Sequence, residues 1–175
     1  MLTLTLFRHA KSSWELNGLD DRERPLNARG SSAAPLMAGF MHDHRIRPEL
    51  VLCSTAVRTR QTLELVLSGM KPAPKVKYDD ALYLADPILP LERVRKAPRT
   101  TKHVMIVGHN PGLQILAVEL IGEGDPGQIG AISDKLPTAG VVVMTFDAKS
   151  WADVAPGKGR LTHFATPKML MAAAA

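Results

Sequence analysis

The sequence predicts an α/β fold, a three-layer α/β/α sandwich around a mostly parallel central sheet. Short apolar or alternating runs typical of strands recur at residues 2–7, 49–53 and 103–107, and longer stretches with helix-capping signals separate them. Strands that alternate with helices imply βαβ crossovers, which cover both faces of a parallel sheet. The 175 residues contain no internal repeat and no linker-like segment. Residues 1–175 are therefore expected to form a single domain.

Three strands and three helices are expected before residue 100. The strands are predicted at residues 2–7, 49–53 and 75–78, and the helices at residues 27–44, 56–67 and 87–96. The first strand alternates leucine with threonine, and the second is apolar. Asn27 is a plausible N-cap for the first helix. Pro35 lies inside that helix and is expected either to kink it or to mark a restart.

The C-terminal part of the chain continues the alternation. The expected elements are a buried strand at 103–107, a helix at 111–121, a last central strand at 140–146 and an edge strand at 161–164. The segment Gly122–Lys135 is rich in glycine and acidic residues, and it is predicted to be a surface loop, as is Lys149–Gly159. The loop at 10–26 is long for a compact domain, and such loops are often functional.

Composition excludes several classes of protein. The apolar fraction of 45% is sufficient for a core, and the single cysteine cannot form an internal disulfide. Lys and Arg outnumber Asp and Glu by 22 to 17, a net charge of +5. The cations are scattered and aromatic residues make up only 5%, so no nucleic-acid partner is expected. No apolar run approaches the roughly 20 residues that cross a bilayer, and no signal peptide is recognisable. We therefore expect a cytoplasmic protein with no membrane partner; the sequence does not indicate an oligomeric state.

Polar residues suited to binding an anion follow three of the predicted strands. They are Arg8 and His9 after the first, Ser54 and Arg58 after the second, and His109 and Asn110 after the strand at 103–107. Ligands of open α/β sheets bind at the carboxyl ends of the strands, so these side chains are expected to meet at one edge of the sheet. Arginine presents a planar fork of donors that matches phosphate oxygens. The arrangement predicts a site for a phosphoryl group.

Four ordered segments carry a family resemblance. They are Leu6–Trp14 (LFRHAKSSW), Asp21–Gly30 (DRERPLNARG), Cys53–Thr62 (CSTAVRTRQT) and Val107–Gly112 (VGHNPG). Together they resemble the histidine phosphatase (phosphoglycerate-mutase-like) superfamily, and within it the small phosphohistidine phosphatases of the SixA type. The match spans residues 4–146. The Arg-His-Gly of the family stands here as Arg8-His9-Ala10, a substitution that the SixA-like branch tolerates.

The resemblance implies that His9 is the nucleophile that becomes phosphorylated, and that Arg8, Arg58 and His109 hold the phosphoryl oxygens. Ser54 and Asn110 are expected to contact the phosphate as well. Neutral imidazole is a competent nucleophile near pH 7, and two guanidinium groups with a protonated second imidazole would stabilise an in-line transition state. No metal or other cofactor is expected, because the arginines supply the positive charge.

A general acid is harder to assign. Position relative to Tyr83 places Asp80 where many superfamily members carry a carboxylate, but the SixA-like branch lacks a clear equivalent, and Asp80 in a solvated turn is an equally good interpretation. An alkoxide leaving group needs a proton, whereas a phosphoimidazole leaves more readily, so a weak acid fits a P–N substrate. The expected activity is removal of phosphate from a protein phosphohistidine, of the HPt type or another phosphotransfer protein. The alternatives are a small-molecule phosphomonoesterase with Asp80 as acid, and a non-catalytic phosphate- or phosphoprotein-binding module.

Three further residues bear on the expected site. Trp14 is expected either to form a substrate-contacting rim or to anchor the loop at 10–26. Arg24, in the same loop, is expected either to orient a substrate or to be an exposed charge without a specific role. Cys53 stands one residue too close to Arg58 for a cysteine-dependent phosphatase loop, so it is interpreted as a buried strand residue.

Overall fold

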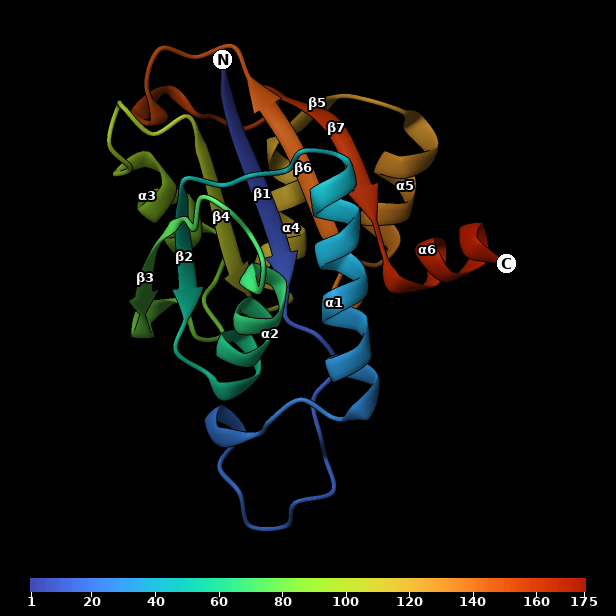
Figure 1. The fold of residues 1–175 in the computed structure, drawn as a ribbon. Coiled ribbons are helices and arrows are strands. Elements are labelled where there is room, and N and C mark those ends of the chain that lie inside the picture. Colours follow the sequence, from blue (N-terminus) through green and yellow to red (C-terminus); the bar gives the residue numbers. More distant parts are fainter.

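The computed structural model describes residues 1–175, which fold around a single seven-stranded sheet in the order β3-β2-β4-β1-β6-β7-β5 (Figure 1). The strands are β1 (Leu2–Arg8), β2 (Leu50–Ser54), β3 (Lys75–Asp79), β4 (His103–Gly108), β5 (Ile121–Glu123), β6 (Val141–Phe146) and β7 (Gly159–Ala165). Only β6 runs against its neighbours, pairing antiparallel with both β1 and β7. The predicted fold class, a mostly parallel sheet, is confirmed.

Helices cover both faces of this sheet. They are α1 (Ala28–Asp43), α2 (Val57–Leu67), α3 (Ile88–Arg95), α4 (Gly112–Leu120), α5 (Pro126–Asp134) and α6 (Pro167–Ala174), and short 3-10 helices occupy η1 (Asp21–Glu23), η2 (Asp80–Leu82) and η3 (Trp151–Asp153). In Figure 1, α1 and α2 lie in front of the sheet and α4 lies behind it. None of the helices combines the length and the apolar character that crossing a membrane requires.

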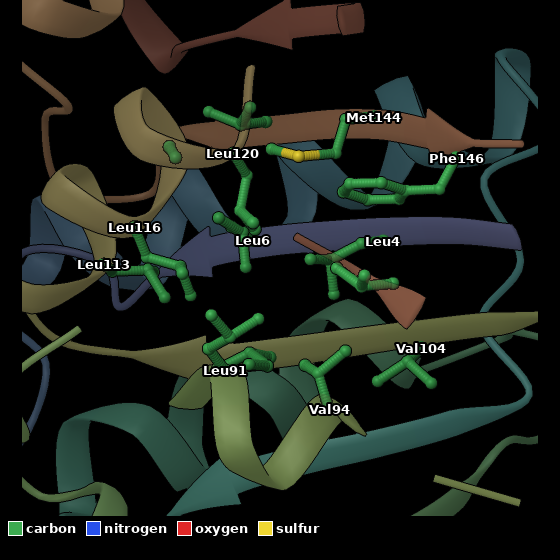
Figure 2. Close-up of a cluster of buried hydrophobic side chains, with 14 of the residues drawn as sticks. Leu4, Leu6, Leu91, Val94, Val104, Leu113, Leu116, Leu120, Met144 and Phe146 are labelled. Carbon is green, nitrogen blue, oxygen red and sulfur yellow. The ribbon is translucent and has the colours of Figure 1, made fainter. Parts of the chain in front are cut away.

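The alternation of side chains along β1 explains the three layers. Leu4 and Leu6 point to one face, where they pack with α3 and α4 in a large buried cluster (Figure 2). Phe7 points to the other face and joins a second cluster that includes residues of α1 and α2. Successive residues of a strand face opposite sides, so β1 contributes apolar side chains to both faces. Its buried Thr5 is accommodated because its hydroxyl lies 2.8 Å from Nε2 of His103. Each buried apolar side chain stabilises the fold by about 1.5–3 kcal/mol.

The first helix is continuous although it contains a proline. Asn27 caps α1, its side chain accepting from the backbone N–H of Gly30 at 2.9 Å. Pro35 lies inside the helix without a restart. Proline lacks the N–H that would bond to the carbonyl of Ser31, and both residues are exposed, so water can solvate that carbonyl.

Two expectations for the C-terminal part of the chain were wrong, and a third, the loop at 149–159, holds except for a buried turn. The predicted loop Gly122–Lys135 contains β5 and α5: Asp125 caps α5 by accepting from the N–H of Gln128 at 2.8 Å, and proline occupies its first turn. The strand predicted at the edge, now β7, has β5 paired outside it. Within the predicted loop 149–159, Trp151 is buried in η3, and its indole N–H donates to the carbonyl of Thr101.

Sheet order places the candidate site. Strands β2, β4 and β1 are consecutive neighbours and mutually parallel, so their carboxyl ends, at Ser54, Gly108 and Arg8, lie side by side. Figure 1 shows these three strands pointing toward the end of the molecule where the loop at 10–26 lies. The residues that follow these strand ends therefore share one small volume.

Candidate active site

The structure brings together the residues that follow the three strand ends. The rings of His9 and His109 lie with their centroids 5.3 Å apart. The Arg58 guanidinium, in the first turn of α2, lies 3.4 Å from Nδ1 of His109, and Nε2 of His109 lies 2.8 Å from the hydroxyl of Ser54. We call Arg8, His9, Arg58 and His109 the strand-end site.

His9 is held in one tautomer with one ring nitrogen available. Its Nδ1 lies 2.7 Å from the carbonyl oxygen of Ala10, and a carbonyl can only accept, so Nδ1 carries the proton. Nε2 therefore holds the lone pair. Burial, followed by the positive charges of Arg58 and Arg8, lowers the pKa of His9 to about 3. The imidazole is neutral near pH 7, the state in which it can act as a nucleophile.

His109 has the opposite tautomer. A guanidinium can only donate, so Nδ1 of His109 accepts from Arg58, and Nε2 donates its proton to Ser54. Burial first, then His9 and Arg58, lowers the pKa of His109 to about 3. Without a bound anion, His109 is therefore neutral near pH 7 and not protonated as expected. A phosphate dianion placed between the arginines would oppose these charges and raise the pKa.

Each of the two arginines of the site keeps one buried donor free. Arg58, 2% exposed, donates from Nη1 to the backbone carbonyl of Asp21 at 2.7 Å and from Nη2 to its carboxylate at 3.0 Å. Arg8, which is half-buried, donates from Nη1 to the carbonyl of Leu136 at 3.0 Å. The Nε groups of both arginines are buried without any hydrogen-bond partner. Buried donors without acceptors are costly, and an anion would satisfy them.

Asp21, in the loop at 10–26, is a part of the site that sequence reasoning missed. Oδ2 of its carboxylate accepts from Arg58 and from the hydroxyl of Tyr83. Oδ1 accepts from Arg24 through both Nε at 3.0 Å and Nη2 at 2.9 Å. The Tyr83 hydroxyl and then the two arginines hold the pKa of Asp21 well below its usual range. Asp21 is separated from Arg58 by 37 positions and from Tyr83 by 62, so no local pattern signals the cluster.

The prediction that Arg24 is an exposed charge is wrong. It is 8% exposed, donates to the hydroxyl of Ser12 at 2.8 Å and to the carbonyl of Ser13 at 3.1 Å, and stacks 3.5 Å from the ring centre of Trp14. The Trp14 ring is held by this cation–π contact, while the residue remains 74% exposed. Trp14 is thus anchored and yet presents its surface to solvent.

Asp80 lies at the outer margin of the site. Its Oδ1 accepts from the hydroxyl of Thr55 at 2.5 Å and from Arg22 at 3.2 Å, and its side chain is 77% exposed. The guanidinium of Arg22 lies 4.5 Å from the ring centre of Tyr83, which connects this margin to the Asp21 cluster. The structure therefore ties Asp80 to two partners at the surface.

Asn110 and Ala10 contact the backbone around the site. Nδ2 of Asn110 donates at 2.8 Å to the carbonyl of Leu136, the same oxygen that accepts from Arg8, and its buried Oδ1 has no partner. The N–H of Ala10 donates to the hydroxyl of Thr62, which in turn donates to the carbonyl of Arg58. Thr62, also missed from the sequence, thus connects the chain after His9 to α2.

The prediction that Cys53 is a buried strand residue is confirmed, since it is 0% exposed and burial raises its pKa to about 12.

Paired histidines and arginines at the strand ends of this α/β fold form a site suited to binding and transferring a phosphoryl group. The chain belongs to the histidine phosphatase superfamily, branch 1, whose sequence profile matches residues 4–83.

Proteins similar to this chain match it over nearly its whole length. An uncharacterised protein of Mycobacterium tuberculosis is 37% identical over 163 residues, which cover 92% of this chain and 99% of the relative. A candidate phosphohistidine phosphatase SixA from Agrobacterium tumefaciens has a similar structure, with a TM-score of 0.81 and 30% identity over 95% of this chain and 98% of that one. A second SixA candidate, from Nakamurella, gives a TM-score of 0.82 at 29% identity, covering 95% and 96%.

Proposed function

We propose that this chain removes phosphate from phosphohistidine on another protein, of the HPt type or a related phosphotransfer protein, through a covalent phospho-His9 intermediate. Two observations carry the proposal: the buried Nε donors of Arg8 and Arg58 have no hydrogen-bond partner, and Nε2 of His9 holds a free lone pair. Two such donors on cations suit the oxygens of a phosphoryl group. The likeness to SixA candidates supports the substrate class.

In the first step, Nε2 of His9 attacks phosphorus in line with the P–N bond of the substrate. A new P–N bond forms to His9 as the old one breaks, and the departing imidazole keeps the electron pair and takes a proton from solvent. Arg8 and Arg58 bind the phosphoryl oxygens throughout. Phosphoryl transfer depends mainly on such positioning and charge stabilisation.

In the second step, water attacks the phosphorus of phospho-His9. The P–O bond forms, the P–N bond to Nε2 breaks, and inorganic phosphate leaves while His9 regains its lone pair. The carbonyl of Ala10 keeps the Nδ1 proton in place through both steps. His109, once the bound phosphoryl group has raised its pKa, adds a positive charge to the arginines.

The surroundings of the site favour a P–N substrate over a phosphate ester. Asp80, the expected acid, is engaged with Thr55 and Arg22 at the margin, and imidazole needs less acid catalysis than an alkoxide does. The exposed ring of Trp14 provides a rim that another folded protein can contact. In this mechanism the arginines take the part of a metal, and we expect activity without one.

The experiment is to incubate the protein with a phosphohistidine protein, a phosphoserine peptide and a sugar phosphate in the presence of EDTA. We expect release from phosphohistidine and an acid-labile, base-stable phosphate on the enzyme. His9→Ala should abolish both, lowering kcat/KM by at least about 10⁴-fold. His42→Ala, which removes an exposed histidine at the end of α1, serves as the matched control.

Each other outcome selects an alternative. Fast release from the sugar phosphate alone would indicate the small-molecule phosphomonoesterase with Asp80 as acid. Binding of phosphate without release from any substrate would indicate the non-catalytic module. Loss of activity in EDTA that added metal restores would contradict the metal-independent mechanism.

A further inference from the structure

A groove of about 480 Å³ lies beside the strand-end site and takes no part in the mechanism above. Its walls come from the segment after His9, the first turns of α1, residues 137–138 and the start of α6. Figure 1 shows α6 beside α1, and the two helices are in contact. We call this the α1–α6 groove.

The groove is continuous with the nucleophile's backbone. Lys11, on its wall, is two positions after His9, and its backbone packs so tightly on α1 that a Cβ at Gly30 would lie 2.1 Å from the Lys11 carbonyl oxygen. On the other side, Thr138 is followed by Ala139, whose N–H contacts the carbonyl of His9 at 2.9 Å. A chain segment lying in the groove would therefore lie close to the backbone that carries His9.

The groove carries positive charge that nothing in the protein neutralises. Lys11, Arg29 and Lys168 line it, all three are exposed, and no acidic residue lines it. None of the three takes part in any of the salt bridges of the protein, which involve other cations. Between the cations lie apolar side chains, among them Leu36 and Met171, which is 59% exposed. Cations around an apolar floor complement an acidic amphipathic segment.

We propose that the α1–α6 groove docks an acidic amphipathic segment of the phosphoprotein whose phosphohistidine enters the strand-end site. This inference rests on the proposed function for the identity of the partner. Carboxylates of the segment pair with Lys11, Arg29 and Lys168, and its apolar side chains cover Leu36 and Met171. The groove then selects among phosphohistidine proteins by charge, while the site itself recognises the phosphoryl group.

The test compares two substrates, free phosphohistidine and an acidic HPt domain phosphorylated on its histidine with phosphoramidate. Arg29→Glu/Lys168→Glu should lower the ratio of kcat/KM for the domain to kcat/KM for the amino acid by about tenfold. The control, Arg47→Glu/Lys71→Glu, makes the same charge change in a second groove, of about 570 Å³, that borders the opposite end of α1. It should leave the ratio unchanged.

A binding measurement separates this proposal from the proposed function. Calorimetry with the unphosphorylated HPt domain involves no chemistry, and the Arg29→Glu/Lys168→Glu variant should raise its Kd about tenfold relative to the Arg47→Glu/Lys71→Glu control. Equal Kd values and equal kcat/KM ratios for the two variants would overturn the docking proposal. A wild-type protein that binds the domain through the groove and yet releases no phosphate from either substrate would contradict the function alone.

Discussion

The strand-end site and the loop at 10–26 lie against each other but are held in place differently. Arg8, His9 and His109 are positioned by the register of neighbouring parallel strands. The loop has no pairing with that sheet, and its Asp21 is held by hydrogen bonds to Arg58 and Tyr83. The sheet thus positions Arg8, His9 and His109, and the loop positions Arg58 through the hydrogen bonds of Asp21. Substitutions and pH should therefore affect the two regions in different ways.

Acid should destabilise the strand-end site before it affects the loop. His9 and His109 have pKa values of about 3 in the folded protein against 6.5 in the unfolded chain. Between these values the unfolded state binds protons that the folded state does not, so stability is present above pH 6.5 and is lost as pH falls toward 3. Between pH 7.5 and pH 5, each histidine should lower the free energy of unfolding by about 2 kcal/mol, or about 4 kcal/mol together.

Urea denaturation at the two pH values measures this loss. In the His9→Gln/His109→Gln variant, the loss of stability between pH 7.5 and pH 5 should be smaller by the contribution of these two histidines. His103, whose pKa is also lowered to about 4, contributes equally to the loss in both proteins. The loop contains no histidine, and the pKa of Asp21 lies below its usual range, so its carboxylate stays charged at pH 5. An equal loss in wild type and variant would show that the two site histidines are not buried in neutral form.

Arg58 belongs to the site and also binds the loop, so its replacement should have the largest effect on catalysis after that of His9. Arg58→Lys keeps the charge and loses the planar fork that reaches Asp21 while leaving a donor for the phosphoryl group. We expect kcat/KM for phosphohistidine to fall by about 10²–10³-fold. Arg60→Lys, an exposed change on the same helix, is the control and should have little effect. Equal activities would mean that Arg58 acts only as a point charge.

The contrast between the two regions also explains how much could be predicted from sequence. Strand β1 alternates leucine with threonine and strands β2 and β4 are apolar runs, so all three can be recognised from sequence. The residues just after them share one sheet edge by the topology of parallel sheets, so the amino-acid sequence alone groups the four residues of the strand-end site. It does not group Asp21 and Tyr83 with them, because their contacts join positions far apart along the chain. Proximity of this kind depends on how a loop packs, which local patterns do not describe.

The main error in secondary structure has a similar cause, because packing of distant residues outweighs the local composition. The segment 122–135 has glycines that favour a loop, but Asp125 followed by proline is a helix-start signal. The glycine-rich composition masks that signal. Burial of Ile132 against the core gives α5 a stability that its glycine content does not suggest. Tertiary packing determines the conformation of this segment, as it does that of the loop at 10–26.

The contact between the two regions can be tested directly at Asp21. Asp21→Asn removes the charge but leaves the backbone carbonyl that accepts from Arg58, so kcat/KM should fall by only about tenfold. Burial and Asp21 raise the pKa of Tyr83, and the substitution should bring that pKa down. Spectrophotometric titration in a Tyr78→Phe background reports on Tyr83 alone, because the chain has two tyrosines. Glu23→Gln, in the same short helix η1, is the control. An unchanged pKa of Tyr83 would contradict the contact between loop and site.

The smallest effect is expected at Asp80, where the margin of the site joins the loop through Arg22. Asp80→Asn keeps an oxygen that can accept from Thr55 and loses the ion pair, and an exposed pair of this kind contributes little. Because imidazole leaves without a strong acid, we expect kcat/KM for phosphohistidine to fall by no more than about threefold, and that for a phosphate ester to fall further. Both rates are measured on the same preparation, with Asp86→Asn as an exposed control. If Asp80→Asn abolished phosphohistidine hydrolysis as fully as His9→Ala does, Asp80 would be the general acid, and the preference for a P–N substrate would have to be abandoned.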